Sequence, residues 1–596
     1  MIRLVAAEAA PRGGARAVVG PIDLTIEPGE RHLVVGANGS GKTTLMRLLA
    51  GLAPAAAGSI RWDGLPDARG AASPGRAAAS EGPPALWPRV AALFETPDPQ
   101  FLADTVRSDI AFGLEGLGIS AAEMRDRIDE AVHAYGLRLL ADRDPRTLSA
   151  GEKARALLAA AHAARPACLL LDQTLAHLDP GARRAFEARL AGAERAGAFA
   201  VVRTHQECEP PFAGERFHVL DEGRLHDIGA LTPADVHAGR RLPLPLATRV
   251  AAVLEARGAW NGTTAADISA LRAGLECGGG ATTVHLPRAL ARTDPPRAAS
   301  AERAPRSERA AFALDAVRWG PGRGTPLFEN FDLAGERGGI VALVGRSGSG
   351  KTSLLRLLAG IDAPHAGTAW RPPTPKGVRR ATALALEYPE RQLIGRTVLE
   401  DVAMALWVDG IPEGERDRRA RIALAAVGVD VERFAGRAPF TLSEGEKRRV
   451  ALAGLLAEPA PLLLFDEPTA GLDPEGRRAL RDTFAALRAG ERTIIVASHD
   501  LDFVHAVADR VVLLARGEEG PAQVIREGAP GDVFRDAPAM SEAAMPPPDV
   551  VLVEDLLRAW EWLPATPVRG GDALIELLER GAASRSAPTT TDVGAA

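Results

Sequence analysis

The chain has 596 residues, enough for several domains, and its net charge of -6 reflects 71 basic and 77 acidic side chains. This near balance provides no overall positive field of the kind that favours nucleic-acid binding. No apolar run is long enough to span a membrane, and Arg3 and Glu8 interrupt the N-terminus, so we expect a soluble, cytoplasmic chain without a signal peptide. The three cysteines lie far apart without a CxxC pair, which argues against a disulfide framework or a zinc site.

The first motif in chain order is a phosphate-binding loop. Residues 33–43 read LVVGANGSGKT, an apolar run followed by the G-x-x-x-x-G-K-[ST] pattern. Its glycines let backbone N–H groups close around phosphate oxygens at a helix N-terminus. Lys42 would reach the β and γ phosphates of ATP, and the Thr43 hydroxyl would bind Mg²⁺. The predicted ATP-binding residues are Gly36, Asn38, Gly39, Ser40, Gly41, Lys42, Thr43 and Thr44.

An acidic strand end follows downstream. Residues 169–180 read LLLDQTLAHLDP, which predicts a buried strand that ends at Asp172. In an open parallel α/β sheet, ligands bind at the carboxyl ends of the strands. A carboxylate at that edge is a hard oxygen ligand, so Asp172 is a predicted Mg²⁺ ligand.

The second half of the chain repeats both motifs. Residues 345–352 read GRSGSGKT, and residues 462–474 read LLLFDEPTAGLDP, in which Asp466 and Glu467 follow the strand. The spacing from Asp172 to His205 and from Asp466 to His499 is 33 residues in both halves. A long-period repeat of this quality indicates a tandem duplication. The ATP-binding residues predicted in this loop are Gly345, Ser347, Gly348, Ser349, Gly350, Lys351, Thr352 and Ser353, with Thr352 and Asp466 as Mg²⁺ ligands.

A third matched segment opens a helix in each half. It reads TLSAGEKAR at residues 147–155 and TLSEGEKRR at residues 441–449. A single such segment is typical of a helix N-cap with a capping glutamate. Its repetition at the same place indicates an anion-binding helix terminus. The predicted ligands of ATP in these two segments are Ser149, Gly151, Ser443 and Gly445.

These motifs together resemble the ATP-binding subunits of ABC transporters, over nearly the whole of both halves. The family's LSGGQ signature is LSAGE here at residues 148–152 and LSEGE at residues 442–446, so the third and fifth positions depart from it. The resemblance implies an α/β fold with two tandem P-loop ABC ATPase domains, each with a helical subdomain and a small C-terminal helical tail. It also implies that two domains stack head to tail, with ATP between the phosphate loop of one and the signature helix of the other.

A finer resemblance is to the ATPases of energy-coupling factor importers. Each half carries a P-x-x-Q segment, then Thr-Val and an aspartate, Asp109 or Asp401, and each tail has an amphipathic helix behind a proline cluster. Asp267 and Asp572 fall at similar places in the two tails. The resemblance implies ATP-driven import of a vitamin or a transition-metal ion. It implies a location at the cytoplasmic face of the cell membrane, an integral-membrane scaffold and a substrate-capturing membrane protein as partners, and no nucleic acid.

The two halves differ at positions that matter in this family. The glutamate that polarises the attacking water corresponds to Glu467 in the second half and to Gln173 in the first, and a neutral amide is a poor general base. The resemblance therefore implies that hydrolysis is efficient at one composite site. Trp319 stands where family members stack an aromatic ring on adenine, whereas the first half offers Ala9 and Ala10.

Other family positions are shared by both halves. His205 and His499 correspond to the switch histidine that contacts the γ-phosphate, a catalytic role. Glu95 and Glu387 replace the Q-loop glutamine, so that a carboxylate is the predicted Mg²⁺ ligand there. The family's second glutamine is retained as Gln100 and Gln392.

The sequence predicts six segments. They are an ATPase domain with a degenerate site (1–230), its tail (231–287), a flexible linker (288–310), a catalytically complete ATPase domain (311–535), its tail (536–584) and a disordered C-terminus (585–596). The alternative function is a soluble tandem ATPase acting on the ribosome, which would need a strongly basic helical linker. The connecting region here is broken by Pro and Gly and contains arginine but no lysine.

Overall fold

The computed structural model describes most of the two halves. The described residues are 1–10, 18–37, 39–62, 86, 89–178, 180–194, 200–205, 215–229, 244–256, 260, 268–278, 310–321, 326–374, 380–386, 392–442, 444–470, 472, 474–489, 492–517, 520–560, 562–563 and 568–581. Residues 288–309 of the predicted linker (288–310) and the predicted disordered C-terminus at 585–596 lie outside them, whereas residue 310 begins a strand. Among these residues, no helix combines the length and apolar character that crossing a membrane requires.

Each half is built on two sheets, as the α/β resemblance implies. In the first half, an antiparallel sheet has the order β2-β1-β4 and a six-stranded sheet has the order β5-β6-β7-β3-β8-β9, which is parallel except for the last pair. The strands are β1 (Ile2–Ala9), β2 (Val19–Ile26), β3 (Arg31–Val35), β4 (Ala57–Trp62), β5 (Val90–Leu93), β6 (Cys168–Asp172), β7 (Ala200–His205), β8 (Arg216–Asp221) and β9 (Arg224–Gly229).

The second half has the same topology, which confirms the duplication in three dimensions. Its sheets have the orders β11-β10-β13 and β14-β15-β16-β12-β17-β18. The strands are β10 (Ala310–Trp319), β11 (Phe328–Glu336), β12 (Gly339–Val344), β13 (Ala366–Trp370), β14 (Thr382–Ala385), β15 (Leu462–Asp466), β16 (Thr493–Ala497), β17 (Arg510–Arg516) and β18 (Ala522–Gly528). All five residues of β15 are buried, as expected for a central strand of a parallel sheet.

Helices cover the sheets and form a separate subdomain in each half. The phosphate loops lead into α1 (Lys42–Leu49) and α9 (Lys351–Ala359). The helical subdomains contain α2 (Val106–Glu115), α3 (Ala121–Ala134) and α4 (Ala150–Ala163) in the first half, and α10 (Val398–Val408), α11 (Glu413–Ala426), α12 (Val431–Phe434) and α13 (Glu444–Ala457) in the second. Further helices of the ATPase domains are α5 (Pro180–Glu194), α14 (Pro474–Ala489) and α15 (Leu501–Val507).

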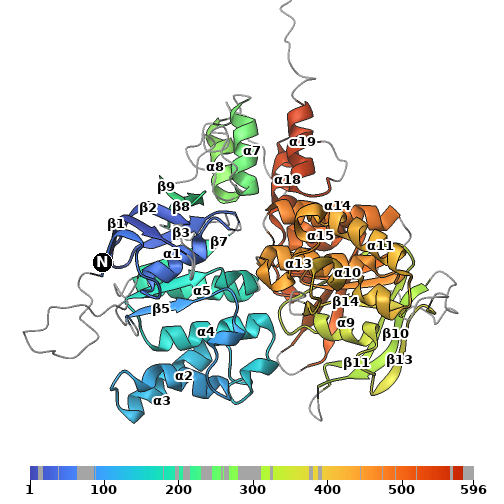
Figure 1. Cartoon of the computed structure of the whole chain (residues 1–596), viewed down its shortest axis with the longest axis horizontal. Coiled ribbons are helices and arrows are strands. Elements are labelled where there is room, and N and C mark those ends of the chain that lie inside the picture. Colours follow the sequence, from blue (N-terminus) through green and yellow to red (C-terminus); the bar gives the residue numbers. More distant parts are fainter. Residues whose placement is uncertain are drawn as a thin grey trace, which may run out of the picture.

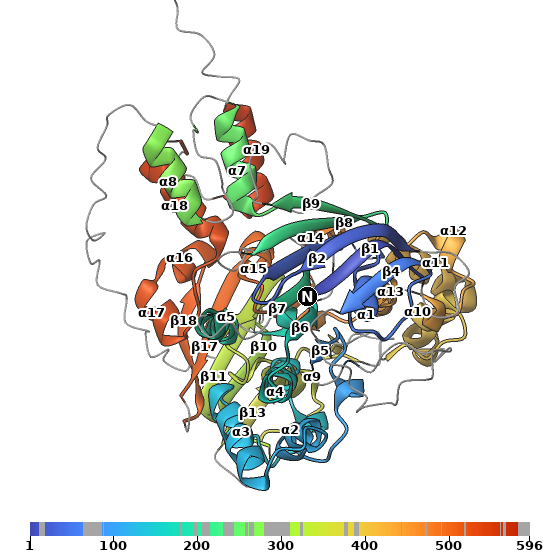
Figure 2. The same cartoon turned by 90° about the vertical axis from the view of Figure 1, so that its left-hand side faces the viewer.

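The predicted tail helices form and pack against one another across the two halves. The first tail has α7 (Leu246–Glu255) and α8 (Ile268–Gly278), and the second has α17 (Ala537–Glu542), α18 (Asp549–Ala559) and α19 (Gly571–Gly581). A short helix, α16 (Pro530–Arg535), ends the second ATPase domain just before its tail. Pro245 and Pro548 immediately precede α7 and α18, where a fixed φ suits a helix start. Figure 1 shows α7 beside α19, Figure 2 also shows α8 beside α18, and both pairs are in contact.

The tails share one hydrophobic core. Leu254 and Leu271 of the first tail belong to the same buried cluster as Val550 and Leu574 of the second. A polar bridge supplements this core, because Asp572 at the start of α19 accepts a hydrogen bond of 2.8 Å from Arg249 of α7. The two halves of one chain are therefore joined at their tails.

Candidate functional site

The phosphate loops require glycine where each loop turns into its helix. Gly41 and Gly350 have φ of 104° and 98°, in the left-handed region that other residues rarely adopt. A Cβ on Gly41 would lie 2.2 Å from a methyl group of Val19, and a Cβ on Gly350 would lie 2.7 Å from the Phe328 ring. The backbone can therefore close around phosphate only with glycine at these positions.

The lysine of each loop curls back onto the loop. Lys42 Nζ donates hydrogen bonds to the carbonyls of Gly36 (2.7 Å) and Ala37 (2.9 Å). Lys351 Nζ donates to the carbonyls of Gly345 (2.7 Å) and Arg346 (3.1 Å). Both ammonium groups are buried. When ATP binds, its phosphate oxygens would replace the loop carbonyl oxygens as the hydrogen-bond acceptors of the two lysines.

The residues at the ends of β6 and β15 suit a magnesium ion. Burial raises the pKa of Asp466 to about 6 and the neighbouring Thr352 hydroxyl partly lowers it, so the two predicted ligands of the second half lie close together. In the first half, Thr204 Oγ1 donates to Asp172 Oδ1 at 2.6 Å, while the buried Asp172 Oδ2 has no hydrogen-bond partner among the described residues. A buried carboxylate oxygen of this kind and a hydroxyl fit Mg²⁺, which prefers oxygen ligands.

Glu467 and His499 form an ion pair in the second half, in which the glutamate is buried and the histidine is half-buried. Glu467 Oε1 lies 2.9 Å from His499 Nδ1, and Glu467 Oε2 accepts hydrogen bonds from the Ser498 hydroxyl (3.1 Å) and the His499 N–H (3.2 Å). Burial opposes both charges, but the attraction to His499 lowers the pKa of Glu467 to about 2, and Glu467 raises the pKa of His499 to about 9. Glu467 is therefore ionised at neutral pH, as a general base must be.

The first half has a neutral side chain at the matching place. Gln173 and Glu467 both follow the strand aspartate, and both have positive φ, of 54° and 47°. Such a conformation is costly for a residue other than glycine, and its occurrence in both halves indicates that the same turn projects both side chains. The halves therefore differ here in side-chain chemistry and not in backbone geometry.

Gln173 is engaged by a carboxylate from another loop. Its Nε2 donates to Glu95 Oε2 at 3.0 Å. Gln100 holds the backbone on both sides of Glu95, because its side chain bonds to the Phe94 N–H (3.0 Å) and to the carbonyls of Phe94 (2.9 Å) and Thr96 (2.7 Å). Glu95, at the Q-loop position, and Gln173, at the position of the family's catalytic glutamate, are thus neighbours, a pairing that the sequence did not suggest.

The two predicted switch histidines differ in strand register. Asp172 pairs with Thr204, the residue before His205, whereas Asp466 pairs with Ala497, two residues before His499. His205 is the last residue of β7 and is buried, while the His499 side chain lies beyond the end of β16 and is 26% exposed. Equal spacing in sequence therefore does not give equal positions in the two sites.

One composite site is closed by the signature serine of the other half. Ser149 is the N-cap of α4, and its hydroxyl lies 3.2 Å from the hydroxyl of Ser347 in the second phosphate loop. The matching pair at the first phosphate loop would be Asn38 and Ser443, which lie outside the described residues, as does Glu387. Where it can be compared, the structure has the head-to-tail arrangement implied by the resemblance, within a single chain.

Trp319 lies near the second phosphate loop. It ends β10, is half-buried, and its ring centroid is 6.2 Å from that of Phe328. Phe328 in turn packs against Gly350 of the loop. Trp319 is thus one aromatic ring away from the loop, and stacking on adenine remains a prediction.

The signature helices also contact their own halves, through residues that the sequence analysis missed. On α4, Lys153 Nζ forms an ion pair of 2.6 Å with Asp98 in the loop that carries Glu95. On α13, Arg448 Nη2 donates to the backbone carbonyl of Glu467 at 2.7 Å. Both cations are buried, and their place inside the repeated signature segment was the signal that could have marked them.

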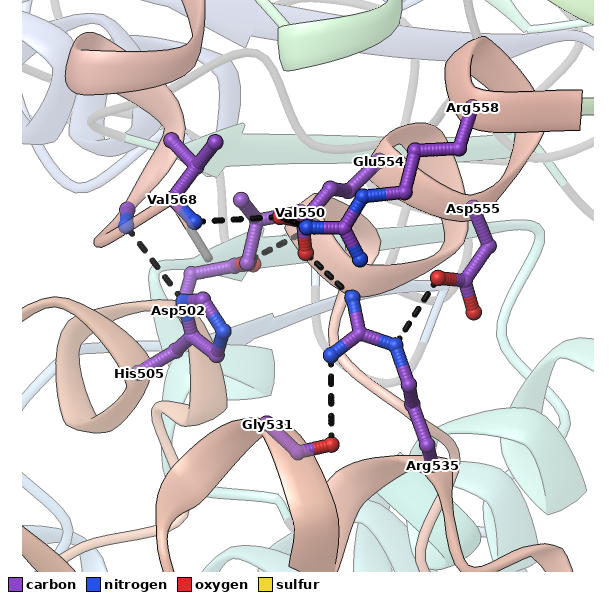
Figure 3. A network of polar contacts seen from close by, with 10 residues as sticks. Asp502, His505, Gly531, Arg535, Val550, Glu554, Asp555, Arg558 and Val568 are labelled. Atoms are coloured by element: carbon purple, nitrogen blue, oxygen red, sulfur yellow. Dashed lines mark hydrogen bonds and ion pairs between the residues drawn. The ribbon is translucent and has the colours of Figure 1, made fainter. Parts of the chain in front are cut away.

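The second tail is hydrogen-bonded to α15, the helix that follows His499. Figure 3 shows Asp502 accepting a hydrogen bond from the Val550 N–H (3.1 Å). His505 Nδ1 accepts a hydrogen bond from the Gly570 N–H (3.3 Å). In the same network, the buried Glu554 pairs with Arg535 and with Arg558 (2.6 Å). The position of α15 is therefore fixed by the tail.

The comparisons with known proteins agree with this geometry. The profile of the family described as ABC transporter matches residues 19–176 and 328–470, half of the chain. An ABC transporter ATP-binding protein of Bifidobacterium longum is 30% identical over 560 residues, which cover 89% of this chain and 66% of that protein. The energy-coupling factor transporter ATP-binding protein EcfA2 of Streptococcus pneumoniae is 35% identical over 253 residues, which cover 40% of this chain and 88% of that protein.

Among solved structures, a chain of ribosome-bound archaeal Pelota and ABCE1 aligns with a TM-score of 0.53 and 19% identity, over 85% of this chain and 76% of that one. At this identity the likeness shows the fold alone. The duplicated family match, the relative that aligns with 89% of this chain and the paired phosphate loops lead to one conclusion. The chain belongs to the ABC transporter family, as an ATP-binding and ATP-hydrolysing protein with two tandem ATPase domains.

Proposed function

We propose that this chain energises an importer of the energy-coupling factor type, which takes up a vitamin or a transition-metal ion. ATP binding would close the two halves on each other, and hydrolysis with product release would reopen them. The partners would be an integral-membrane scaffold and a substrate-capturing membrane protein. The relatives named as energy-coupling factor ATPases support this class.

The observation that carries the proposal is a matched pair of apolar loops in the two helical subdomains. Asp109 Oδ1 accepts hydrogen bonds from the Leu102 N–H (2.7 Å) and the Ala103 N–H (3.1 Å). Asp401 Oδ1 accepts the equivalent bonds from Ile394 (2.7 Å) and Gly395 (2.6 Å). These are the aspartates that carry the finer resemblance, and both hold a tight loop before a helix.

Each pinned loop presents a large apolar side chain to solvent. Leu102 is 68% exposed and Ile394 is 74% exposed. An exposed aliphatic side chain gains nothing from folding, so a loop built to display one is suited to an apolar partner surface. Two such loops in one chain suit a membrane partner that contacts both halves.

Within this function the two sites would have different roles. Glu467, Lys351, Asp466 and His499, closed by Ser149, would hydrolyse ATP. The site of Lys42, Asp172 and Gln173, closed by Ser443 and Gly445, would bind ATP and hydrolyse it slowly. Mg²⁺ would be held by Thr352 and Asp466 in one site and by Thr43 and Asp172 in the other, and it would neutralise charge on the β and γ phosphates.

The test is fractionation of cells that produce the full chain with its transporter partners. The double variant Leu102→Asp/Ile394→Asp should be lost from the membrane fraction while the purified chain still hydrolyses ATP. The matched control is Leu52→Asp/Ile361→Asp, which alters two exposed residues just after α1 and α9 and should stay membrane-bound. Unchanged membrane association of the loop variant would contradict the proposal, and co-sedimentation of the chain with ribosomes would favour the alternative function.

A further inference from the structure

The second signature helix holds the catalytic loop of its own half. Arg448 lies on α13, is 6% exposed, and donates from Nη2 to the Glu467 carbonyl at 2.7 Å. A hydrogen bond from a charged donor in a buried site is stronger than one between neutral groups. Arg448 therefore fixes the orientation of the peptide group on the C-terminal side of Glu467.

The backbone conformation of Glu467 is energetically costly. Glu467 has φ of 47°, a conformation that a residue with a side chain keeps only when its surroundings impose it. The Glu467 N–H is held on the other side by the Ala497 carbonyl at 2.8 Å. With both ends of the residue fixed, the carboxylate is directed toward His499.

By the duplication, the same helix would also serve the other nucleotide site. The N-terminus of α4 reaches the second phosphate loop through Ser149 and Ser347, and α13 would have the corresponding place at the first phosphate loop. One end of α13 would therefore face ATP bound by Lys42, while Arg448, in its second turn, contacts Glu467. Movement of α13 on closure would reach the general base through the contact between Arg448 and the Glu467 carbonyl.

The first half lacks this link. In the repeated segment, TLSAGEKAR against TLSEGEKRR, Arg448 corresponds to Ala154, which is fully buried. Gln173, the counterpart of Glu467, therefore has no arginine at this position of the signature helix. The arginine and the glutamate occur together in one half, and the alanine and the glutamine occur together in the other.

We propose that Arg448 is a positioning residue for Glu467 and couples closure of the first nucleotide site to hydrolysis at the second. This inference rests on the proposed general-base role of Glu467. Since Arg448 acts through the backbone of Glu467, its loss should lower turnover without weakening ATP binding.

The experiment measures kcat and KM for ATP with the full chain carrying Arg448→Ala, in the wild-type and Glu467→Gln backgrounds. Arg448→Ala should lower kcat by about tenfold or more, because small misplacements of a catalytic group have large effects on rate. KM should change by less than about twofold, as expected when only the transition state is affected. Arg448→Lys should recover part of the loss, and Arg421→Ala, on α11 of the same subdomain, should behave as wild type.

The Glu467→Gln background separates positioning from a merely structural role. In this background, adding Arg448→Ala should leave the remaining turnover unchanged. If Glu467→Gln alone has no measurable turnover, the kcat and KM of Arg448→Ala in the wild-type background decide whether Arg448 is a positioning residue. An equal loss in both backgrounds, a raised KM or an unchanged kcat would overturn the proposal. If Arg448→Ala does not fold, Arg448→Lys and Arg448→Gln are compared in the same two backgrounds. Near-normal turnover of Glu467→Gln alone would refute the general-base role itself, a distinct failure.

Discussion

Gln173 Nε2 lies 3.0 Å from Glu95 Oε2, so the first site pairs an amide with a carboxylate where the second site has a glutamate bound to histidine. The usual family order of the two side chains, a Q-loop glutamine and a Walker-B glutamate, is reversed in this pair. Position 173 of the first site therefore still has a carboxylate beside it, but that carboxylate belongs to a different loop.

This pairing predicts that Gln173→Glu alone will not create a second efficient site. The new carboxylate would lie against Glu95, and two carboxylates at this distance cannot both ionise easily, so one would hold a proton. The double variant Glu95→Gln/Gln173→Glu removes the repulsion and should raise turnover above that of Gln173→Glu. Steady-state ATP hydrolysis in the Glu467→Gln background measures the difference. Equal rates for the single and double variants would show that Glu95 does not restrain the first site.

The contact between Ser149 and Ser347 predicts that the two halves pair within one chain. The hydroxyls are 3.2 Å apart, so Ser149→Cys/Ser347→Cys should form a disulfide on mild oxidation. The product should run as a monomer with altered mobility on a non-reducing gel, and reduction should restore normal mobility. Each single variant is the control for the native cysteines. A disulfide-linked dimer specific to the double variant would indicate pairing between chains instead.

The first half contains a buried histidine pair that should make it sensitive to acid. His32 Nδ1 lies 2.9 Å from His218 Nε2, and the rings are stacked with centroids 5.1 Å apart. Burial lowers the pKa of both histidines, and it lowers that of His218 to about 4. The carboxylates of Glu30 and Asp227 oppose this decrease, and the positive charge of Arg216 adds to it. Both histidines are therefore neutral in the folded protein at neutral pH.

Acid should destabilise the chain through this pair. An unfolded histidine titrates near pH 6.5, so between about pH 6.5 and 4 the unfolded state binds more protons, and the stability of the fold falls as pH falls. The corresponding residues of the second half are Val341 and Val512. His32→Val/His218→Val should therefore show a smaller drop in melting temperature between pH 7.5 and 5 than the wild type. An equal drop would mean that other groups control acid stability.

Much of the fold and of the site was predictable because the motifs are local. The phosphate loops, the strand ends at Asp172 and Asp466, and the tail helices behind prolines each follow from a short stretch of sequence, and the structure confirms where they lie. The duplication also predicted that the two halves share one topology.

The remaining features join residues that are distant in sequence. No spacing rule places Glu95 beside Gln173 or Arg448 beside the Glu467 carbonyl, because these contacts depend on how loops pack across the sheet edge. The position of His205 was inferred from an equal spacing of 33 residues, but the pairing of Asp172 with Thr204 changes its register. Nothing in the sequence distinguishes His32 and His218 from other strand residues, because their contact depends on the pairing of β3 with β8.

The steady-state turnover of Glu467→Gln, measured with the proposed membrane partners, decides whether only one of the two similar sites hydrolyses ATP efficiently. The carboxamide keeps the size of the side chain but removes the base that His499 holds in its ionised form. We expect turnover to fall at least about 100-fold, the lower end of what a general base contributes, with ATP binding retained. Turnover within a few-fold of the wild type would contradict it, because the first site would then have to hydrolyse ATP without a glutamate at position 173.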